Sequence, residues 1–278
     1  MTPSGSLQQG GVFPLDTPLA TDATTGWKLH PCFKGGSRNA KLLSCHASAL
    51  VPEKRPHPPH RHEDEEFLLV LAGCVDLILP EGRTAGEPER RRLTTGEFAY
   101  YPAGFPHTIE AAGTTTANYL MLKWADKRFV PPAPLAFKTG TTRPPESTGT
   151  PCDKFSSNTL LEGATLCLEK FNVHLSEVAP GGGYGAHQDD HEVILVLLEG
   201  EIETAGKRAR PHGVVYHAAG ESHGMANPGT VPARYLVLEL HGHKAAKRLA
   251  GTVSEFIKAH AQNEYHLWAT RLKRLIPS

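Results

Sequence analysis

Residues 57–73 read HPPHRHEDEEFLLVLAG, and this stretch decides the fold class of the 278-residue chain. Two histidines, His60 and His62, stand two positions apart ahead of an acidic cluster that ends at Glu66. An apolar run follows and closes at Gly73. Short apolar runs bounded by Gly and Pro are typical of β-strands. The stretch therefore predicts a loop that enters a buried strand.

Side chains at alternate positions of a strand point to the same face. His60 and His62 should therefore project together, and Glu66 keeps their parity if the strand is regular. A later segment, residues 96–107 (GEFAYYPAGFPH), ends in His107 after a Pro-x-Gly turn that should aim it back toward the same interior. Three imidazoles and one carboxylate suit a divalent first-row metal. Surface histidines in a proline-rich loop are the alternative, but the combined spacings favour a metal site.

The two segments resemble the two signature motifs of the cupin superfamily. The first is His-x-His, three residues, Glu, six residues, Gly, and the second is Gly, five residues, Pro-x-Gly-x-x-His. The resemblance implies a jelly-roll β-barrel that holds a metal on three His and one Glu. Its ligands here would be His60, His62, Glu66 and His107. Two positions depart from the motifs, because Lys54 replaces a Gly and Ala111 replaces an Asn.

The second half of the chain repeats the first. The shift in numbering that places His187 on His60 also places Gly200 on Gly73, without a gap between them. A repeat of this length predicts two tandem barrels and not a solenoid. The expected fold is all-β, with two cupin barrels and a C-terminal α-helix that follows a capping box at Thr252 and Glu255. The expected parts are an N-terminal tail and lead-in (1–34), the first barrel (35–125), a proline-rich linker (126–158), the second barrel (159–241) and a helical segment (242–278).

The second copy departs from the motif. In place of the four ligands it has His187, Asp189, Val193 and His223, so the carboxylate position is lost. A β-bulge that turns His191 or Glu192 inward would restore a ligand set, and the second site would then consist of His187, His191, Glu192 and His223. The alternative is a degenerate barrel that serves packing, dimerisation or substrate closure. The spacing His187-x-x-x-His191 is also similar to the C-terminal cupin of ureidoglycine aminohydrolases.

Strand parity nominates further residues of the barrel interior. His46 and His174 precede the ligand loops of the two copies, and Tyr100 and His217 lie on the strands that lead into the second motif. We take Tyr100 and His46 as candidate catalytic residues. The alternative is that each is a hydrogen-bonded structural residue of the barrel. The interior is expected to be lined by Phe67, Leu69, Tyr100 and Phe105.

The amino-acid composition argues against some classes of binding partner. The 29 basic and 29 acidic residues leave no net charge, which removes the attraction that nucleic-acid or acidic-membrane binding needs. No apolar stretch reaches the roughly 20 residues that span a bilayer, and the N-terminus lacks the features of a signal peptide, so we expect a cytoplasmic protein. The five cysteines form no Cys-x-x-Cys pair, which argues against a disulfide framework or a thiolate zinc site.

The ligand set points to function. Three His and one Glu leave open positions on an octahedral ion for a substrate or dioxygen. We expect one divalent transition metal per chain (Fe, Mn, Ni or Zn), a second if the second copy binds one, a small chelating metabolite as substrate, and a homodimer. Iron(II)-type dioxygenase chemistry is slightly favoured. A non-redox isomerase, decarboxylase or aminohydrolase is the first alternative, and a non-catalytic binding protein is the second.

Overall fold

Strands and turns make up the described part of the chain, as the apolar runs bounded by Gly and Pro predict. The computed structural model describes residues 5–79, 88–126, 131–143 and 155–243. These ranges contain no helix, so the predicted all-β class is confirmed, and no membrane-spanning helix occurs in them. The unit Met1–Gly242 carries the fold. The helix expected within 242–278 lies outside the described residues.

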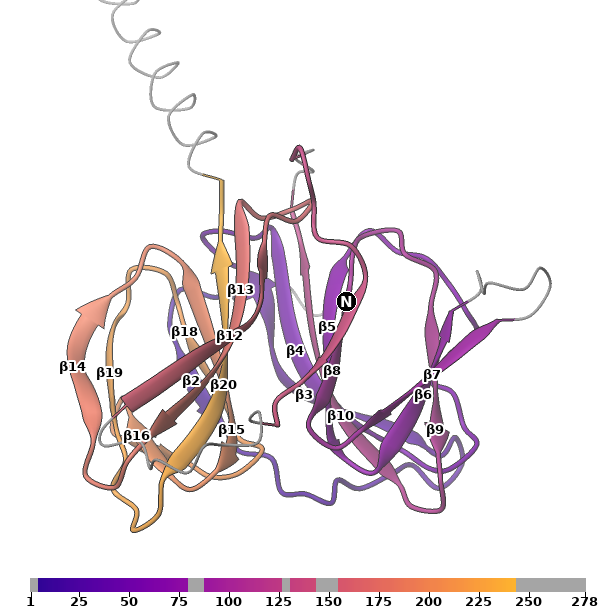
Figure 1. The fold of residues 1–278 in the computed structure, drawn as a ribbon, viewed down its shortest axis with the longest axis horizontal. Helices are drawn as coiled ribbons and strands as arrows, with labels where there is room; N and C mark the ends of the chain where they lie inside the picture. Colours follow the sequence, from indigo (N-terminus) through magenta and orange to yellow (C-terminus); the bar gives the residue numbers. More distant parts are fainter. Residues whose placement is uncertain (1–4, 80–87, 127–130, 144–154, 244–278) are drawn as a thin grey trace, which may run out of the picture. The chain divides into compact units, whose positions relative to one another are not determined.

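Two sheets form the first barrel (Figure 1, indigo to magenta), and side chains from both share one apolar core. The larger sheet contains, in spatial order, β1 (Gly5–Ser6), β3 (Trp27–Gly36), β4 (Leu42–Leu50), β10 (Ala117–Ala125), β5 (Glu65–Ala72), β8 (Glu97–Tyr101) and β11 (Lys138–Thr141). The smaller sheet contains β7 (Glu89–Thr94), β6 (Cys74–Leu79) and β9 (Thr108–Ala112).

Two further sheets form the second barrel around its own core (Figure 1, mainly orange to yellow). One contains β12 (Phe155–Gly163), β13 (Lys170–Val178), β20 (Ala233–His241), β15 (Glu192–Glu199), β18 (Val214–His217) and β2 (Gly11–Phe13). The other contains β14 (Gly183–Gln188), β19 (Ser222–Ala226), β16 (Ile202–Thr204) and β17 (Lys207–Ala209).

Strand β5 is buried on both faces, and the two faces serve different cores. Leu68 and Val70 pack inside the first barrel, whereas Phe67 and Leu69 join a third core that contains residues of both barrels. Tyr100 belongs to the same shared core. The structure therefore corrects the expectation that Phe67, Leu69 and Tyr100 line the interior. A strand that is apolar at every position does not reveal which face points inward.

The halves exchange strands. Strand β11, from the proline-rich segment expected to be a linker, pairs with β8 of the first barrel. Strand β2, from the N-terminal tail, pairs with β18 of the second barrel. The shift that relates His60 to His187 also relates Gly11 to Lys138, so the repeat extends into both segments. Each exchanged strand covers a sheet edge that would otherwise leave backbone groups unpaired.

A buried carboxylate strengthens the contact between the barrels. Glu65 is fully buried and accepts hydrogen bonds from Trp124 Nε1 (2.7 Å), Tyr100 Oη (3.0 Å), Thr165 Oγ1 (2.5 Å) and the Leu166 amide (3.0 Å). Glu192, its equivalent in the second barrel, accepts from the amide (3.1 Å) and Nδ2 (2.8 Å) of Asn39. Because Asn39 and Leu166 are equivalent positions of the repeat, the two contacts are reciprocal.

Candidate metal centre

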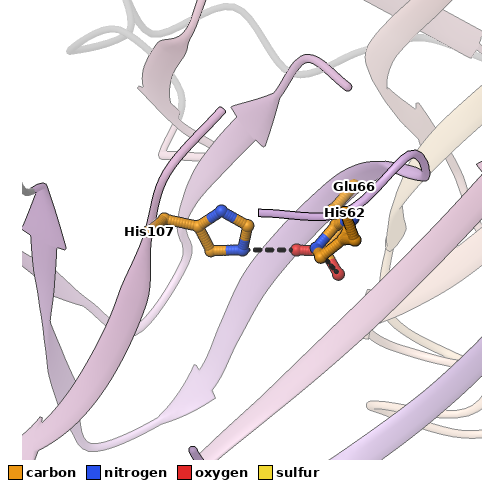
Figure 2. A group of neighbouring side chains, drawn as sticks. All are labelled: His62, Glu66 and His107. Atoms are coloured by element: carbon orange, nitrogen blue, oxygen red, sulfur yellow. Dashed lines mark hydrogen bonds and ion pairs between the residues drawn. The ribbon is translucent and has the colours of Figure 1, made fainter. Parts of the chain in front are cut away.

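The backbone of the first barrel brings the residues of both motifs together. His60 and His107 form an antiparallel bridge, with each amide donating to the other carbonyl at 3.2 Å. Glu66 points inward from the start of β5. One ligand atom from each of His62, Glu66 and His107 lies within 4.8 Å of the others. Figure 2 shows His107 approaching Glu66 from a different segment, which leads into β9.

His60 lies beside this group. Its ring centroid is 5.0 Å from that of His62 and 5.5 Å from that of His107. Its Nδ1 is buried and has no hydrogen-bond partner among the residues that the structure describes. The four residues predicted as ligands therefore meet in one place, with three of them in direct contact and His60 next to them.

Hydrogen bonds fix the orientation of two imidazoles. Nδ1 of His62 donates to the Asp64 carbonyl (3.0 Å), and Nδ1 of His107 donates to the Phe105 carbonyl (2.9 Å). A carbonyl oxygen only accepts, so Nδ1 carries the proton and Nε2 of the neutral ring carries a lone pair. These Nε2 atoms lie 3.1 Å and 2.8 Å from the oxygens of Glu66.

This arrangement fits a metal ion. The Nε2 lone pairs of His62 and His107 face the oxygens of Glu66. Lone pairs repel each other at these distances unless a cation or a proton lies between them. Burial raises the pKa of Glu66, but its contacts with His107, His62 and Lys123 outweigh burial and hold the pKa well below its usual range. A proton shared in a hydrogen bond with Glu66 raises the pKa of His62, and a metal cation would take the place of that proton. Ionised carboxylate and imidazole nitrogens are the donors that divalent transition metals prefer.

Sequence reasoning did not nominate Lys123, although it contacts the site. Lys123 lies on β10 opposite Glu66 in the strand register, and its ammonium forms an ion pair with Glu66 Oε1. One signal was visible in the sequence, since Lys123 interrupts the apolar run 119–124. The contact itself depends on how β5 and β10 are paired.

A cavity of about 400 Å³ opens beside this cluster. Its polar end contains Glu66, His107, Lys123, His46 and His57. Its other walls are largely apolar and include Trp27, Leu29, Phe33, Ile109, Tyr119 and Met121. Burial, together with the nearby Lys123, lowers the pKa of His46 to about 4. His46 is therefore an uncharged imidazole at neutral pH, inside the cavity as predicted.

Tyr100 does not face this cavity. Its hydroxyl donates to Glu65 on the side of the shared core. The neighbouring Tyr101 points inward instead, and its ring stacks on His107 at a centroid distance of 4.1 Å. The prediction of a Tyr100 donor at the site is therefore not supported. The expected strand parity was wrong by one position, and a shift of one position moves a side chain to the opposite face of the sheet.

The second barrel holds a related cluster at the motif positions. His187 and His223 face each other in the β14–β19 register, and Nε2 of each lies 3.4 Å from Asp189 Oδ2. His217 stacks on His223 at 4.2 Å. Asp189 thus supplies a carboxylate where Val193 cannot.

The other two residues expected at the second site lie elsewhere. Glu192 faces away from the second barrel's interior and binds Asn39. His191 lies in a separate group with Glu239 and His241. The expected set of His187, His191, Glu192 and His223 therefore does not form, because no bulge turns Glu192 inward.

Comparison with known proteins supports this geometry. Residues 48–123 match the family model of the cupin domain, and they contain the four predicted ligands and Lys123. No curated protein matches the chain at a significant level. Residues 48–123 are therefore similar to a cupin domain, and the described residues form two tandem β-barrels.

Solved structures share this fold at low identity. A Pseudomonas aeruginosa protein that is described by its assigned name as glyoxylate-induced is 14% identical with a TM-score of 0.64, and the match covers 86% of this chain and 92% of that chain. The Lactobacillus farciminis oxalate decarboxylase in a formate complex is 13% identical with a TM-score of 0.56, covering 84% and 86%. The Escherichia coli protein YlbA is 12% identical with a TM-score of 0.56, covering 84% and 91%. At these identities the likeness concerns the fold alone.

Proposed function

We propose that the chain is a metal-dependent enzyme that acts on a small carboxylate metabolite in the first barrel. His60, His62, Glu66 and His107 would hold one divalent transition metal. The observation that carries the proposal is Lys123, a cation at the polar end of a largely apolar cavity next to Glu66. If Glu66 binds a metal ion, its negative charge no longer balances the positive charge of Lys123. An anion in the cavity would then balance Lys123.

The cavity sets the size of the substrate. About 400 Å³ suits a compact metabolite. Its walls of Leu29, Phe33 and Met121 would cover an apolar part, while Lys123 would bind a carboxylate. The fold neighbours include an oxalate decarboxylase in complex with formate, which agrees with a small carboxylate.

Two groups of the chain can move or hold protons beside the site. His46 is uncharged, because burial lowers its pKa to about 4, so it can accept a proton from a substrate that Lys123 holds in place. Lys123 can neutralise negative charge that develops on the substrate. A bound divalent metal would polarise a carbonyl or carboxylate oxygen of the substrate.

Two reaction classes use such a site. The ligand set alone favours iron(II)-type dioxygenase chemistry slightly. His46 and Lys123 favour the non-redox class, a decarboxylase or isomerase, because proton transfer is central to those reactions.

Metal analysis and oxygen uptake test the proposal. Protein purified without a metal-affinity tag is analysed for metals, reconstituted with Fe(II) under anaerobic conditions, and then mixed with small carboxylates. Consumption of oxygen together with substrate supports the dioxygenase, and turnover without oxygen uptake supports the non-redox enzyme. A fully metal-loaded protein that neither binds nor converts any small carboxylate would overturn the proposed function.

The role of Lys123 gives a second prediction. Lys123→Met should raise KM for the carboxylate substrate about 10- to 100-fold, because a charge-assisted hydrogen bond of roughly 1.5–3 kcal/mol is lost. Metal content should be retained, since Lys123 is not a ligand. Lys28→Met, at an exposed position of β3, is the control and should leave KM unchanged. An unaltered KM in Lys123→Met would remove Lys123 from substrate binding.

A further inference from the structure

The second barrel contains another group of metal-ligating side chains, outside the motif positions. At its centre is Glu239 on β20. His241 Nε2 lies 3.0 Å from Oε2, His174 Nε2 lies 3.3 Å from Oε1, and His191 Nε2 lies 4.0 Å from Oε2. Three imidazole nitrogens from different parts of the sequence thus converge on one carboxylate. The four side chains are between 15% and 24% exposed, so an ion could enter from solvent.

Strand register explains where the carboxylate comes from. In the first barrel, Glu66 on β5 is paired with Lys123 on β10. At the equivalent pair of the second barrel, Val193 on β15 is paired with Glu239 on β20. The inward carboxylate has therefore moved to the neighbouring strand, and the lysine is replaced. This exchange removes a cation and leaves a net negative, imidazole-rich cluster.

Neighbouring polar groups form hydrogen bonds that orient the side chains of the cluster. Hydrogen bonds of this kind also orient the ligands of known metal sites. Nδ1 of His174 forms hydrogen bonds with the hydroxyls of Ser157 (2.9 Å) and Ser176 (3.0 Å), which direct its Nε2 toward Glu239. Asn172 Nδ2 donates to Glu239 Oε2 at 3.0 Å. The rings of His191 and His241 stack with their centroids 3.8 Å apart.

The protonation states also suit a cation. Burial raises the pKa of Glu239, but hydrogen bonds from His174, His241 and Asn172 outweigh it and hold the pKa far below its usual range. Burial and the neighbouring His241 lower the pKa of His191. An ionised carboxylate is the form of Glu239 that binds metal.

We propose that His191, Glu239 and His241, whose ligand atoms lie within 4.8 Å of one another, form a second site for a divalent transition metal. His174, whose Nε2 lies 3.3 Å from Glu239, is the fourth group beside them. This site is separate from the motif cluster of His187, Asp189 and His223. Three imidazoles and one carboxylate match borderline ions such as Zn²⁺, Co²⁺ and Ni²⁺. The site does not depend on the reaction of the first barrel. The proposed site and the first-barrel site are built from different strands. Glu239 and His241 both come from β20, the last strand of the second barrel.

Cobalt binding to the full chain tests this site. The Glu66→Gln background is used because it should weaken the first-barrel site strongly, and Co²⁺ is titrated with absorption spectroscopy and elemental analysis as readouts. We expect one Co²⁺ per chain in Glu66→Gln. Adding Glu239→Gln should weaken this binding at least about 100-fold, whereas adding Asp189→Asn, the matched change at the motif cluster, should leave it intact. His191→Ala is the second variant, and circular dichroism checks that each protein is folded.

The outcomes separate the alternatives. Retention of the ion in Glu66→Gln/Glu239→Gln, or its loss in Glu66→Gln/Asp189→Asn, would overturn the proposal and assign the ion to another site or to the motif cluster. Absence of any Co²⁺ in folded Glu66→Gln would also overturn it. The proposed function is judged separately, because Glu239→Gln alone should keep the first-barrel metal and its activity.

Discussion

Glu66→Gln is expected to lower the metal affinity of the first barrel by at least about 100-fold, more than is typical for loss of an outer-shell partner. The amide keeps the shape of the side chain but removes the negative charge that faces His62 and His107. Isothermal titration with Co²⁺ or Mn²⁺, with elemental analysis of the purified protein, would measure the loss. His60→Ala should weaken binding in the same direction, because it removes another predicted ligand.

The control is the equivalent position of the second copy. His187→Ala should leave the metal of the first barrel in place, since the barrels have separate interiors. Equal loss of first-barrel metal in His60→Ala and His187→Ala would contradict the assignment. So would a Glu66→Gln protein that binds the metal with unchanged affinity.

Glu65→Ala, at the adjacent position, should act on stability instead. We expect it to lower the free energy of unfolding by about 3–5 kcal/mol, because three buried donors, among them Trp124 Nε1 and Thr165 Oγ1, and the half-buried Leu166 amide lose their carboxylate acceptor. Urea unfolding followed by tryptophan fluorescence would report the change. Metal affinity should stay close to that of the unaltered protein, because Glu65 points away from the site.

Glu192→Ala provides the matched comparison. Its carboxylate receives hydrogen bonds from Asn39 alone among those the structure describes, so the expected loss is smaller, about 1–3 kcal/mol. A Glu65→Ala protein as stable as the unaltered one would show that the carboxylate does not hold the barrels together. Loss of metal from a folded Glu65→Ala protein would contradict the division of roles between Glu65 and Glu66.

Much of the fold could be predicted because its signals are local or periodic. The spacing of His60, His62, Glu66 and Gly73 follows from one loop and one strand, and such patterns survive in the sequence without knowledge of strand pairing. The constant shift between the two copies predicted the two barrels in the same way. His46 was found by parity within a single strand, where the polar Ser44, His46 and Ser48 alternate with apolar residues.

Other features depended on which strands pair, and in which register. Tyr100 was assigned to the wrong face because β8 is apolar on both sides. Lys123 and Glu239 are far from the motifs in sequence, and only the pairing of β10 with β5 and of β20 with β15 brings them to the two clusters. The exchange of β2 and β11 between the halves likewise rests on partner strands that are distant in the chain.

The primary structure was therefore sufficient for the all-β class, the duplication and the set of motif residues that meet in the first barrel, because each of these follows from residues close together or from a constant repeat. The direction in which buried residues face, the lysine beside the first site and the carboxylate of the second cluster required the folded chain. Hydrogen bonding between distant strands sets the register, and the register determines which side chains meet across a sheet.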